Sequence, residues 1–337
     1  MLVVRPATSA DYESLMGLAK ASGPGFTSLP EDEPTLRGRL EISEGSFSET
    51  LPVEDRWYVL MMEESDTGEV IGLAGVKAAV GLKRPFASFR RMTFSHYHVS
   101  EQAGTHRNDQ PALVFVNECR GWTEVGSLFL KPDKRIGGAG ALLARSRYLL
   151  IGTRPELFNN MVLAELRGRF DAEGKSPFWE HVTSKFFGMD FDSADELSGK
   201  GDGQFIFDLA PHHPLYESLM HIDAQAAIGQ VFEEGKPAKK LLEREGFQAN
   251  GLVDVFDAGP TMACQRDAIR SVREARVMRT IITDDVEGDP HLLSTTTLND
   301  FRATRAIAEP VEGGIEISRE TADALHIKDG DPVRAIL

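Results

Sequence analysis

The stretch SLFLKPDKRIGGAGALLARSRYLL, residues 127–150, decides the fold. It begins with an apolar segment typical of a strand, continues through a glycine-rich turn and ends in a segment typical of a helix. Gly137, Gly138 and Gly140 let the backbone approach a ligand closely, and the first amides of the following helix lack intrahelical acceptors. This arrangement predicts a site for an anionic group, such as a pyrophosphate, at the start of the helix.

The local charge of this stretch is opposite to that of the chain. One acid, Asp133, accompanies five basic residues, which are Lys131, Lys134, Arg135, Arg145 and Arg147. Such a reversal favours an anionic ligand. An ordinary strand, turn and helix with a solvated charged face would give the same pattern, so the glycine turn alone does not establish a ligand. A nucleotide-hydrolysing phosphate loop would close this turn with Gly-Lys-Ser/Thr, and the turn in this chain closes with Gly-Ala-Gly instead.

Composition limits the partners. The 337 residues include 52 acidic and 37 basic side chains, a formal net charge of −15. Such a surface repels nucleic acid and anionic membranes, so we expect neither as a partner, whereas a small cationic substrate is favoured. With only Cys119 and Cys264, both expected to be inert thiols, we predict no disulfide framework and no metal site. The apolar runs are too short for a secretory signal or a membrane span, which predicts a soluble, cytoplasmic protein.

Periodicity predicts an α/β protein with a mixed sheet flanked by helices. A first strand at 2–5 and a capped helix are followed by a Gly/Pro-rich loop at 22–30, a helix at 33–42 and a hairpin of strands at 57–62 and 70–80. Further predicted strands are 112–117, 123–130, 161–166, 204–209 and 252–256, and further predicted helices are 139–151, 215–229 and 237–245. Beyond residue 280, short β-branched segments predict a small β-rich appendage.

The glycine-rich turn also resembles a known motif. Arg135-Ile136-Gly137-Gly138-Ala139-Gly140 fits the Arg/Gln-x-x-Gly-x-Gly/Ala loop with which GNAT acyltransferases hold the coenzyme A pyrophosphate. Three other segments resemble recurring GNAT elements, namely VVRPATSADYESLMGLA, TGEVIGLAGV and PAKKLLEREGF. The resemblance implies a GNAT-like acyl-coenzyme A-binding core at 1–150, a second GNAT-like α/β half at 151–279 that completes the active site, and a small β-rich subdomain at 280–337.

Longer stretches are similar to the arginine N-succinyltransferase family over nearly the whole chain, including GFTSLPEDEPTL (25–36), AELRGRFDAEGKSPFWEHVTSKFFGMDF (164–191) and EGFQANGLVDVFDAGPT (245–261). Membership implies transfer of succinyl from succinyl-coenzyme A to the α-amine of arginine, or of ornithine, in arginine catabolism. The coenzyme is then a cosubstrate, no cofactor is tightly bound, and we expect a homo-oligomer or a hetero-oligomer with a family homologue. The implied coenzyme contacts are Leu128, Phe129, Leu130, Arg135, Gly137, Gly138 and Gly140.

The two substrates require opposite charges. The succinyl carboxylate needs a cation, for which Arg90 and Arg167 lie in family-like segments. The guanidinium of arginine needs carboxylates, and the candidates are Glu165, Asp254 and Asp257. Each of these residues could instead form a structural ion pair or cap a turn.

One residue departs from the family pattern. The family has a histidine, held to be the proton donor, directly after Gly-Gln-Val, whereas this chain has Phe232, which has no proton to transfer. His213 is the nearest substitute in family-like sequence, so the catalytic acid stays unassigned. Three functions remain open: an active succinyltransferase, a catalytically impaired or regulatory subunit that pairs with an active homologue, and an acyltransferase with another donor or amine.

Overall fold

The computed structural model describes residues 1–23, 29–102, 104–199 and 203–337, so most of the predicted loop at 22–30 lies outside the described residues. The chain forms two compact units. Unit 1 comprises residues 1–79, 122–162 and 264–337, and unit 2 comprises residues 80–121 and 163–263. The predicted domains, divided at residues 150 and 279, are each one continuous stretch of sequence. The two units instead combine separate segments, because strands from distant parts of the chain pair with one another.

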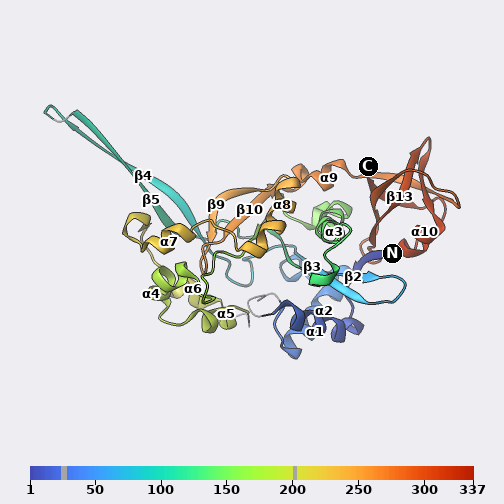
Figure 1. Cartoon of the computed structure of the whole chain (residues 1–337), viewed down its shortest axis with the longest axis horizontal. Helices are drawn as coiled ribbons and strands as arrows, with labels where there is room; N and C mark the ends of the chain where they lie inside the picture. The colour runs from blue at the N-terminus through green and yellow to red at the C-terminus, as the bar shows by residue number, and fades with distance from the viewer. Residues whose placement is uncertain (24–28, 103, 200–202) are drawn as a thin grey trace. The chain divides into compact units, whose positions relative to one another are not determined.

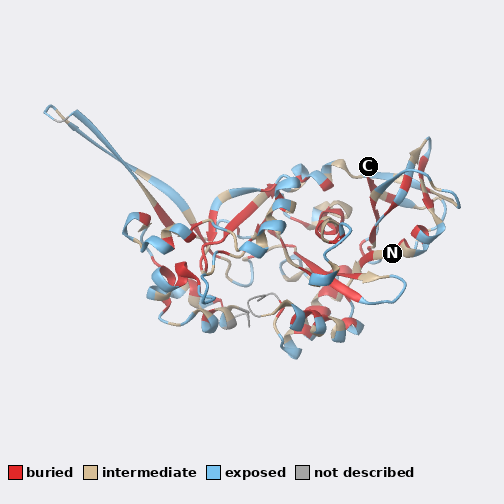
Figure 2. Cartoon of the chain, viewed as in Figure 1, coloured by how far each residue is buried: buried red, intermediate tan, exposed pale blue. Residues whose placement is uncertain are grey.

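The central sheet of unit 1 joins four strands, β1 (Leu2–Pro6), β2 (Trp57–Glu64), β3 (Val70–Lys77) and β6 (Thr123–Leu130). Each pairs antiparallel with the next in this order. The predicted hairpin and the strand at 123–130 are therefore confirmed. Apolar residues on both faces of β2 and β3 are buried (Figure 2), which is why these strands lack a simple alternation of polar and apolar residues.

Helices cover both faces of this sheet (Figure 1). On one face, α1 (Tyr12–Ser22) and α2 (Glu33–Phe47) bury their leucines against Val59, Leu73 and Phe129. On the other face lies α3 (Ala139–Thr153), because a side chain at Gly72, the residue before Leu73, would contact Leu143 of that helix. Adjacent strand residues point to opposite faces, so α3 lies opposite α1 and α2.

The C-terminal part of unit 1 is a small closed barrel, which agrees with the predicted β-rich appendage. Its strands are β11 (Arg276–Thr283), β12 (Asp289–Thr295), β13 (Ala303–Val311), β14 (Gly314–Ser318) and β15 (Pro332–Ile336), with α10 (Arg319–Leu325) beside them. The barrel closes because β12 pairs with both β13 and β15. Strand β13 also pairs with β1, so the barrel continues the central sheet. The short helix α9 (Arg270–Glu274) precedes the barrel.

The strands of unit 2 with a described register pair antiparallel. The strands of this unit are β4 (Ser88–Ser100), β5 (Gly104–Val116), β7 (Met161–Glu165), β8 (Leu215–Tyr216), β9 (Gln248–Asp254) and β10 (Pro260–Gln265). Its helices are a π-helical turn (Trp179–Thr183), α4 (Ser184–Phe187), α5 (Phe191–Gly199), α6 (Gln204–Leu209), α7 (Ile222–Ala227) and α8 (Lys236–Arg244). The core is rich in aromatic side chains, with Phe89, Phe178 and Trp179 fully buried.

Strands β4 and β5 form a long hairpin whose outer part extends away from the rest of unit 2 (Figure 1) and is exposed on both faces (Figure 2). The sequence predicted only its last segment, 112–117, because the polar outer part has no buried face and hence no apolar alternation. No helix within the described residues is long and apolar enough to cross a membrane.

Two predicted elements are wrong. Residues 204–209 form helix α6 and not a strand, because a short apolar run does not distinguish the two states and this one packs its phenylalanines against the aromatic core. Residues 215–229 form β8, a short 3-10 turn and α7 in place of one helix. The predicted helix at 237–245 is confirmed as α8.

Candidate functional site

Strand β6 is interrupted by a bulge directly before the glycine-rich turn. Leu73 pairs with Phe129 and Gly75 with Gly126, so Ala74 alone faces both Ser127 and Leu128. Ser127 adopts a left-handed φ of 49°, which is unusual for a non-glycine residue. A bulge leaves the extra residue outside the ladder of hydrogen bonds, and its amide becomes available to another acceptor. The bulge at Ser127 and Leu128 lies in the strand that the sequence assigned to the coenzyme.

The glycine-rich turn has the geometry of an anion site. Gly137 and Gly138 have positive φ values of 61° and 83°, which other residues adopt only with strain, and Gly138 is the N-cap of α3. A side chain at Gly140 would meet nothing within 4 Å, so the space beside the first turn of α3 is open. Arg135 is exposed, and its Nε donates to the carbonyl of Leu130 at 3.0 Å, which fixes the turn. The first amides of α3 carry the partial positive charge of the helix dipole.

The basic residues of this stretch do not form one cluster. Lys131 pairs with Glu69 at 2.7 Å and Lys134 pairs with Glu64 at 2.6 Å, so acids of the β2–β3 hairpin compensate both lysines. Arg147 is buried, and its Nε donates to a carbonyl of α3 itself. The excess of basic residues in this stretch is therefore partly compensated, because the paired acids come from the β2–β3 hairpin.

The two predicted arginines of unit 2 differ in their surroundings. Arg90 is held by Glu118 in a two-pronged ion pair, with N–O distances of 2.8 and 2.5 Å, and it donates to the carbonyl of Asn250. Its hydrogen bond lowers the pKa of Glu118. These contacts use three of the five N–H donors of Arg90 and favour the structural role that the sequence left open. Arg167 lies among aromatic rings, with its guanidinium carbon 4.1 Å from the ring centre of Phe170.

Phe232 belongs to the same group. The guanidinium of Arg167 lies 5.6 Å from its ring centre, and the rings of Phe170 and Phe232 meet edge to face at 6.0 Å. The backbone N–H of Phe232 donates to the carbonyl of Arg167 at 2.9 Å. The side chain of Phe232 thus faces the guanidinium of Arg167 as an aromatic ring, which can attract a cation but has no hydrogen-bonding group.

Asp254 and Asp257 organise the turn between β9 and β10. Asp254 Oδ1 accepts the N–H groups of Phe256 and Asp257, and the buried Asp257 carboxylate accepts those of Gly168 and Gly259. A side chain at Gly168 would come within 2.3 Å of the Asp257 carbonyl, so only glycine allows this approach. Burial raises the pKa of both carboxyls, and the nearby charge of Asp257 raises that of Asp254 further. Both aspartates act as turn caps, and together they hold the segment that carries Arg167.

Asp195, which no sequence pattern indicated, lies on α5 and joins this group. Burial raises its pKa to about 6, although the nearby Arg167 guanidinium acts in the opposite direction. Glu165 lies half-buried at the end of β7, two residues before Arg167. The group of Arg167, Asp195, Asp254 and Asp257, which we call the acidic group, carries more carboxyls than cations. Asp195 was missed because its titration depends on burial, which helical spacing does not reveal.

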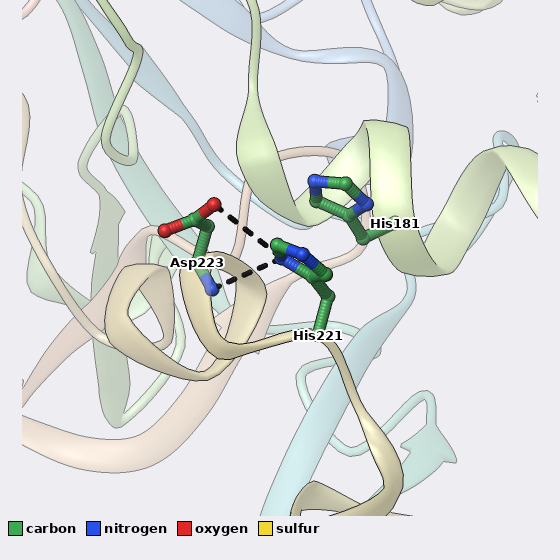
Figure 3. Close-up of side chains that lie close together, drawn as sticks. All are labelled: His181, His221 and Asp223. Atoms are coloured by element: carbon green, nitrogen blue, oxygen red, sulfur yellow. Dashed lines mark hydrogen bonds and ion pairs between the residues drawn. The ribbon is translucent and has the colours of Figure 1, made fainter.

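His213, the predicted substitute acid, is exposed in the segment between α6 and β8. Another exposed group has the residue types of a metal site: His181, His221 and Asp223, whose ligand atoms lie within 4.8 Å of one another (Figure 3). The two imidazole rings stack at 4.0 Å, and Nδ1 of His221 accepts the N–H of Asp223 at 3.3 Å. His221 is therefore the N-cap of α7, which accounts for this arrangement.

Family models match consecutive parts of the chain. The model for the arginine N-succinyltransferase beta subunit matches residues 2–271, and that for its C-terminal domain matches residues 273–336. The chain belongs to the arginine N-succinyltransferase family. Among its relatives, the arginine N-succinyltransferases of Citrobacter koseri and Escherichia coli are 38% and 37% identical, each covered over 97% of its length by the whole of this chain.

A solved relative confirms the fold class. The structure of arginine/ornithine succinyltransferase subunit AI from Pseudomonas aeruginosa matches with a TM-score of 0.88 and 33% sequence identity, and the match covers all of this chain and 98% of the other. The mixed α/β fold, with the β-rich C-terminal part, is therefore that of the arginine N-succinyltransferase family.

Proposed function

We propose that this chain transfers the succinyl group of succinyl-coenzyme A to the α-amine of arginine. The observation that carries the proposal is the bulge of β6 followed by the glycine-rich turn of α3, in a chain that belongs to this family over its whole length. The turn amides and Arg135 would hold the coenzyme pyrophosphate. The amide at Leu128 would donate to the thioester carbonyl, where negative charge develops.

The chemistry needs little beyond positioning. The unprotonated amine attacks the thioester carbonyl, the C–N bond forms, and the C–S bond breaks. The nitrogen loses one proton, directly or through water, and the leaving thiolate gains one. Holding amine and thioester together contributes roughly 7–11 kcal/mol, and one oxyanion donor contributes about 3–4 kcal/mol. A general acid adds roughly 10²–10⁴-fold in rate. The absence of a proton at Phe232 therefore slows the reaction without abolishing it.

The acidic group of unit 2 supports a cationic amine substrate. Asp195 and Glu165 would accept from the guanidinium, and Arg167 would pair with the succinyl carboxylate. Asp257 would help to position Arg167 through its hydrogen bond to the N–H of Gly168. The excess of carboxyls over cations in this group favours a cationic amine, such as arginine or ornithine.

Calorimetry tests the coenzyme part of this proposal. Gly138→Asp and Arg135→Glu each place a negative charge beside the turn, so succinyl-coenzyme A should bind at least tenfold more weakly, about 1.4 kcal/mol. Arg319→Glu, on the exposed start of α10, makes the same change of charge as Arg135→Glu and is its matched control. Unchanged affinity in both loop variants would contradict coenzyme binding at this turn.

A further inference from the structure

A cavity of about 440 Å³ adjoins the glycine-rich turn within unit 1. Its walls come from α3, α9 and the barrel strands β12 and β13. The charged residues that line it are Arg145, Arg270 and Arg305, and His291 lines it as well. Within the part of the chain that the structure describes, no aspartate or glutamate lines this cavity. In a chain with a net charge of −15, three converging arginines mark a site for an anion.

The position of Arg305 ties the cavity to the turn. A side chain at Gly138 would lie 3.5 Å from Nη1 of Arg305, so this guanidinium is a direct neighbour of the N-cap of α3. Arg305 is exposed and, among the described residues, has no ion pair. The half-buried Lys131 and Lys134 are compensated by Glu69 and Glu64, so Arg135 and Arg305 carry positive charge that remains beside the turn.

The other two arginines are held in place by their neighbours. Nε of Arg145 donates to the Ser271 hydroxyl at 2.9 Å, and Nε of Arg270 pairs with Glu274 at 2.8 Å, one turn along α9. Guanidinium groups bind phosphate oxygens with two parallel hydrogen bonds, and fixed guanidinium groups lose little entropy when they do so. Glu274 offsets part of this positive charge, and the guanidinium groups remain the charged side chains that line the cavity.

We propose that this cavity binds a phosphomonoester, the 3′-phosphate of coenzyme A, and that the C-terminal barrel supplies this contact through Arg305. The inference rests on the proposed use of coenzyme A at the adjacent turn. The pyrophosphate occupies the amides of α3, and the second anionic group of the same molecule, with a charge near −2, needs a separate cationic site. The barrel is then a part of the coenzyme site and sets its specificity for the phosphorylated nucleotide.

The test compares coenzyme A with 3′-dephospho-coenzyme A by calorimetry. The wild-type chain should bind coenzyme A about tenfold or more tightly, the value of one charged hydrogen-bonding contact. Arg305→Gln should reduce this ratio towards one, and Arg270→Gln should reduce it in part, which serves if the first variant folds poorly. Arg319→Gln, on the barrel but outside the cavity, should leave the ratio unchanged. Equal affinities in the wild type, or a ratio that Arg305→Gln and Arg270→Gln both leave intact, would overturn the inference.

Inorganic phosphate separates the two sources of a phosphate group. At constant ionic strength it should weaken the binding of coenzyme A and leave that of the dephospho form unchanged, because only the former uses the cavity. Equal weakening of both would place phosphate at the turn and overturn the inference. Failure of both compounds to bind would also remove the proposed coenzyme A function, whereas equal and tight binding removes the 3′-phosphate site alone.

Discussion

The guanidinium of Arg167 lies 5.6 Å from the ring centre of Phe232, and the N–H of Phe232 donates to the Arg167 carbonyl at 2.9 Å. A cation–aromatic contact and a backbone hydrogen bond therefore join a candidate substrate-binding residue to the position where the family has its proton donor. A change at 232 alters both the protons available to the reaction and the surroundings of Arg167, and these two effects can be separated by experiment.

Phe232→His should raise the arginine-dependent rate, by at most the roughly 10²–10⁴-fold contribution of a general acid. Phe232→Leu is the matched control, because it also removes the ring face from Arg167 but brings no proton, and it should not raise the rate. Steady-state kinetics with succinyl-coenzyme A measures both, and coenzyme affinity should hardly change. If the wild type turns over and Phe232→His gives no increase, proton donation at this position does not limit the reaction.

The ionisation of Asp195 should determine how kcat/KM for arginine depends on pH. Burial raises its pKa to about 6, so the carboxylate forms as pH rises through that value, and kcat/KM for arginine should rise with it. Asp195→Asn should remove this inflection and raise the KM for arginine with little effect on that for succinyl-coenzyme A. An inflection that persists in Asp195→Asn would assign it to another group.

Gly140→Ala should separate stability from binding. A methyl group meets no atom within 4 Å at this position, and alanine favours the helix by about 0.5–1 kcal/mol, so the variant should be at least as stable as the wild type. It should nevertheless bind succinyl-coenzyme A more weakly, because the methyl group occupies the space beside the turn. Gly17→Ala in α1, also open within 4 Å, should gain stability without any loss of binding. Thermal unfolding and calorimetry measure the two effects, and full affinity in Gly140→Ala would argue against close approach of the ligand here.

The Asp254 carboxyl should make the folded state less stable as pH rises. Its pKa is raised in the folded chain, so the native state holds a proton that the unfolded chain loses above about pH 4, and stability falls as pH rises from there towards the folded pKa. Asp254→Asn keeps an oxygen for both turn amides and removes the charge. Its unfolding temperature should therefore exceed that of the wild type by a few degrees at pH 8 and by less at pH 5. A lower unfolding temperature at both values would show that the carboxylate itself stabilises the turn.

The sequence predicted those parts of the fold whose signals are local. The strand at 123–130, the glycine-rich turn and the helix after it depend on neighbouring residues, and they are found as expected. The hairpin of β4 and β5 was missed because its outer part has no buried face. The segment 204–209 was assigned to the wrong state because packing against a remote aromatic core, and not propensity, decides it.

In the candidate site, too, the sequence predicted the features that depend on neighbouring residues and missed those that depend on remote ones. The turn was found, but its lysines are paired with Glu64 and Glu69, which no local pattern indicates. Asp254 and Asp257 were found as carboxyls in a family-like segment, but their role as caps depends on the close approach of Gly168. Asp195 and Arg305 became candidates only in the folded structure. Burial raises the pKa of Asp195, and Arg305 lies beside Gly138, which is remote from it in the sequence.

The most direct measurement is turnover by the purified chain alone, with succinyl-coenzyme A and either arginine or ornithine, followed as free thiol. The background should be low, because Cys119 and Cys264 are buried and burial raises the pKa of Cys119 to about 12. We predict thiol release that depends on the amine and produces an equal amount of succinylated amine. Tight binding of succinyl-coenzyme A without release, with either amine and also in Phe232→His, would contradict the assignment as an enzyme and favour a subunit that needs an active homologue.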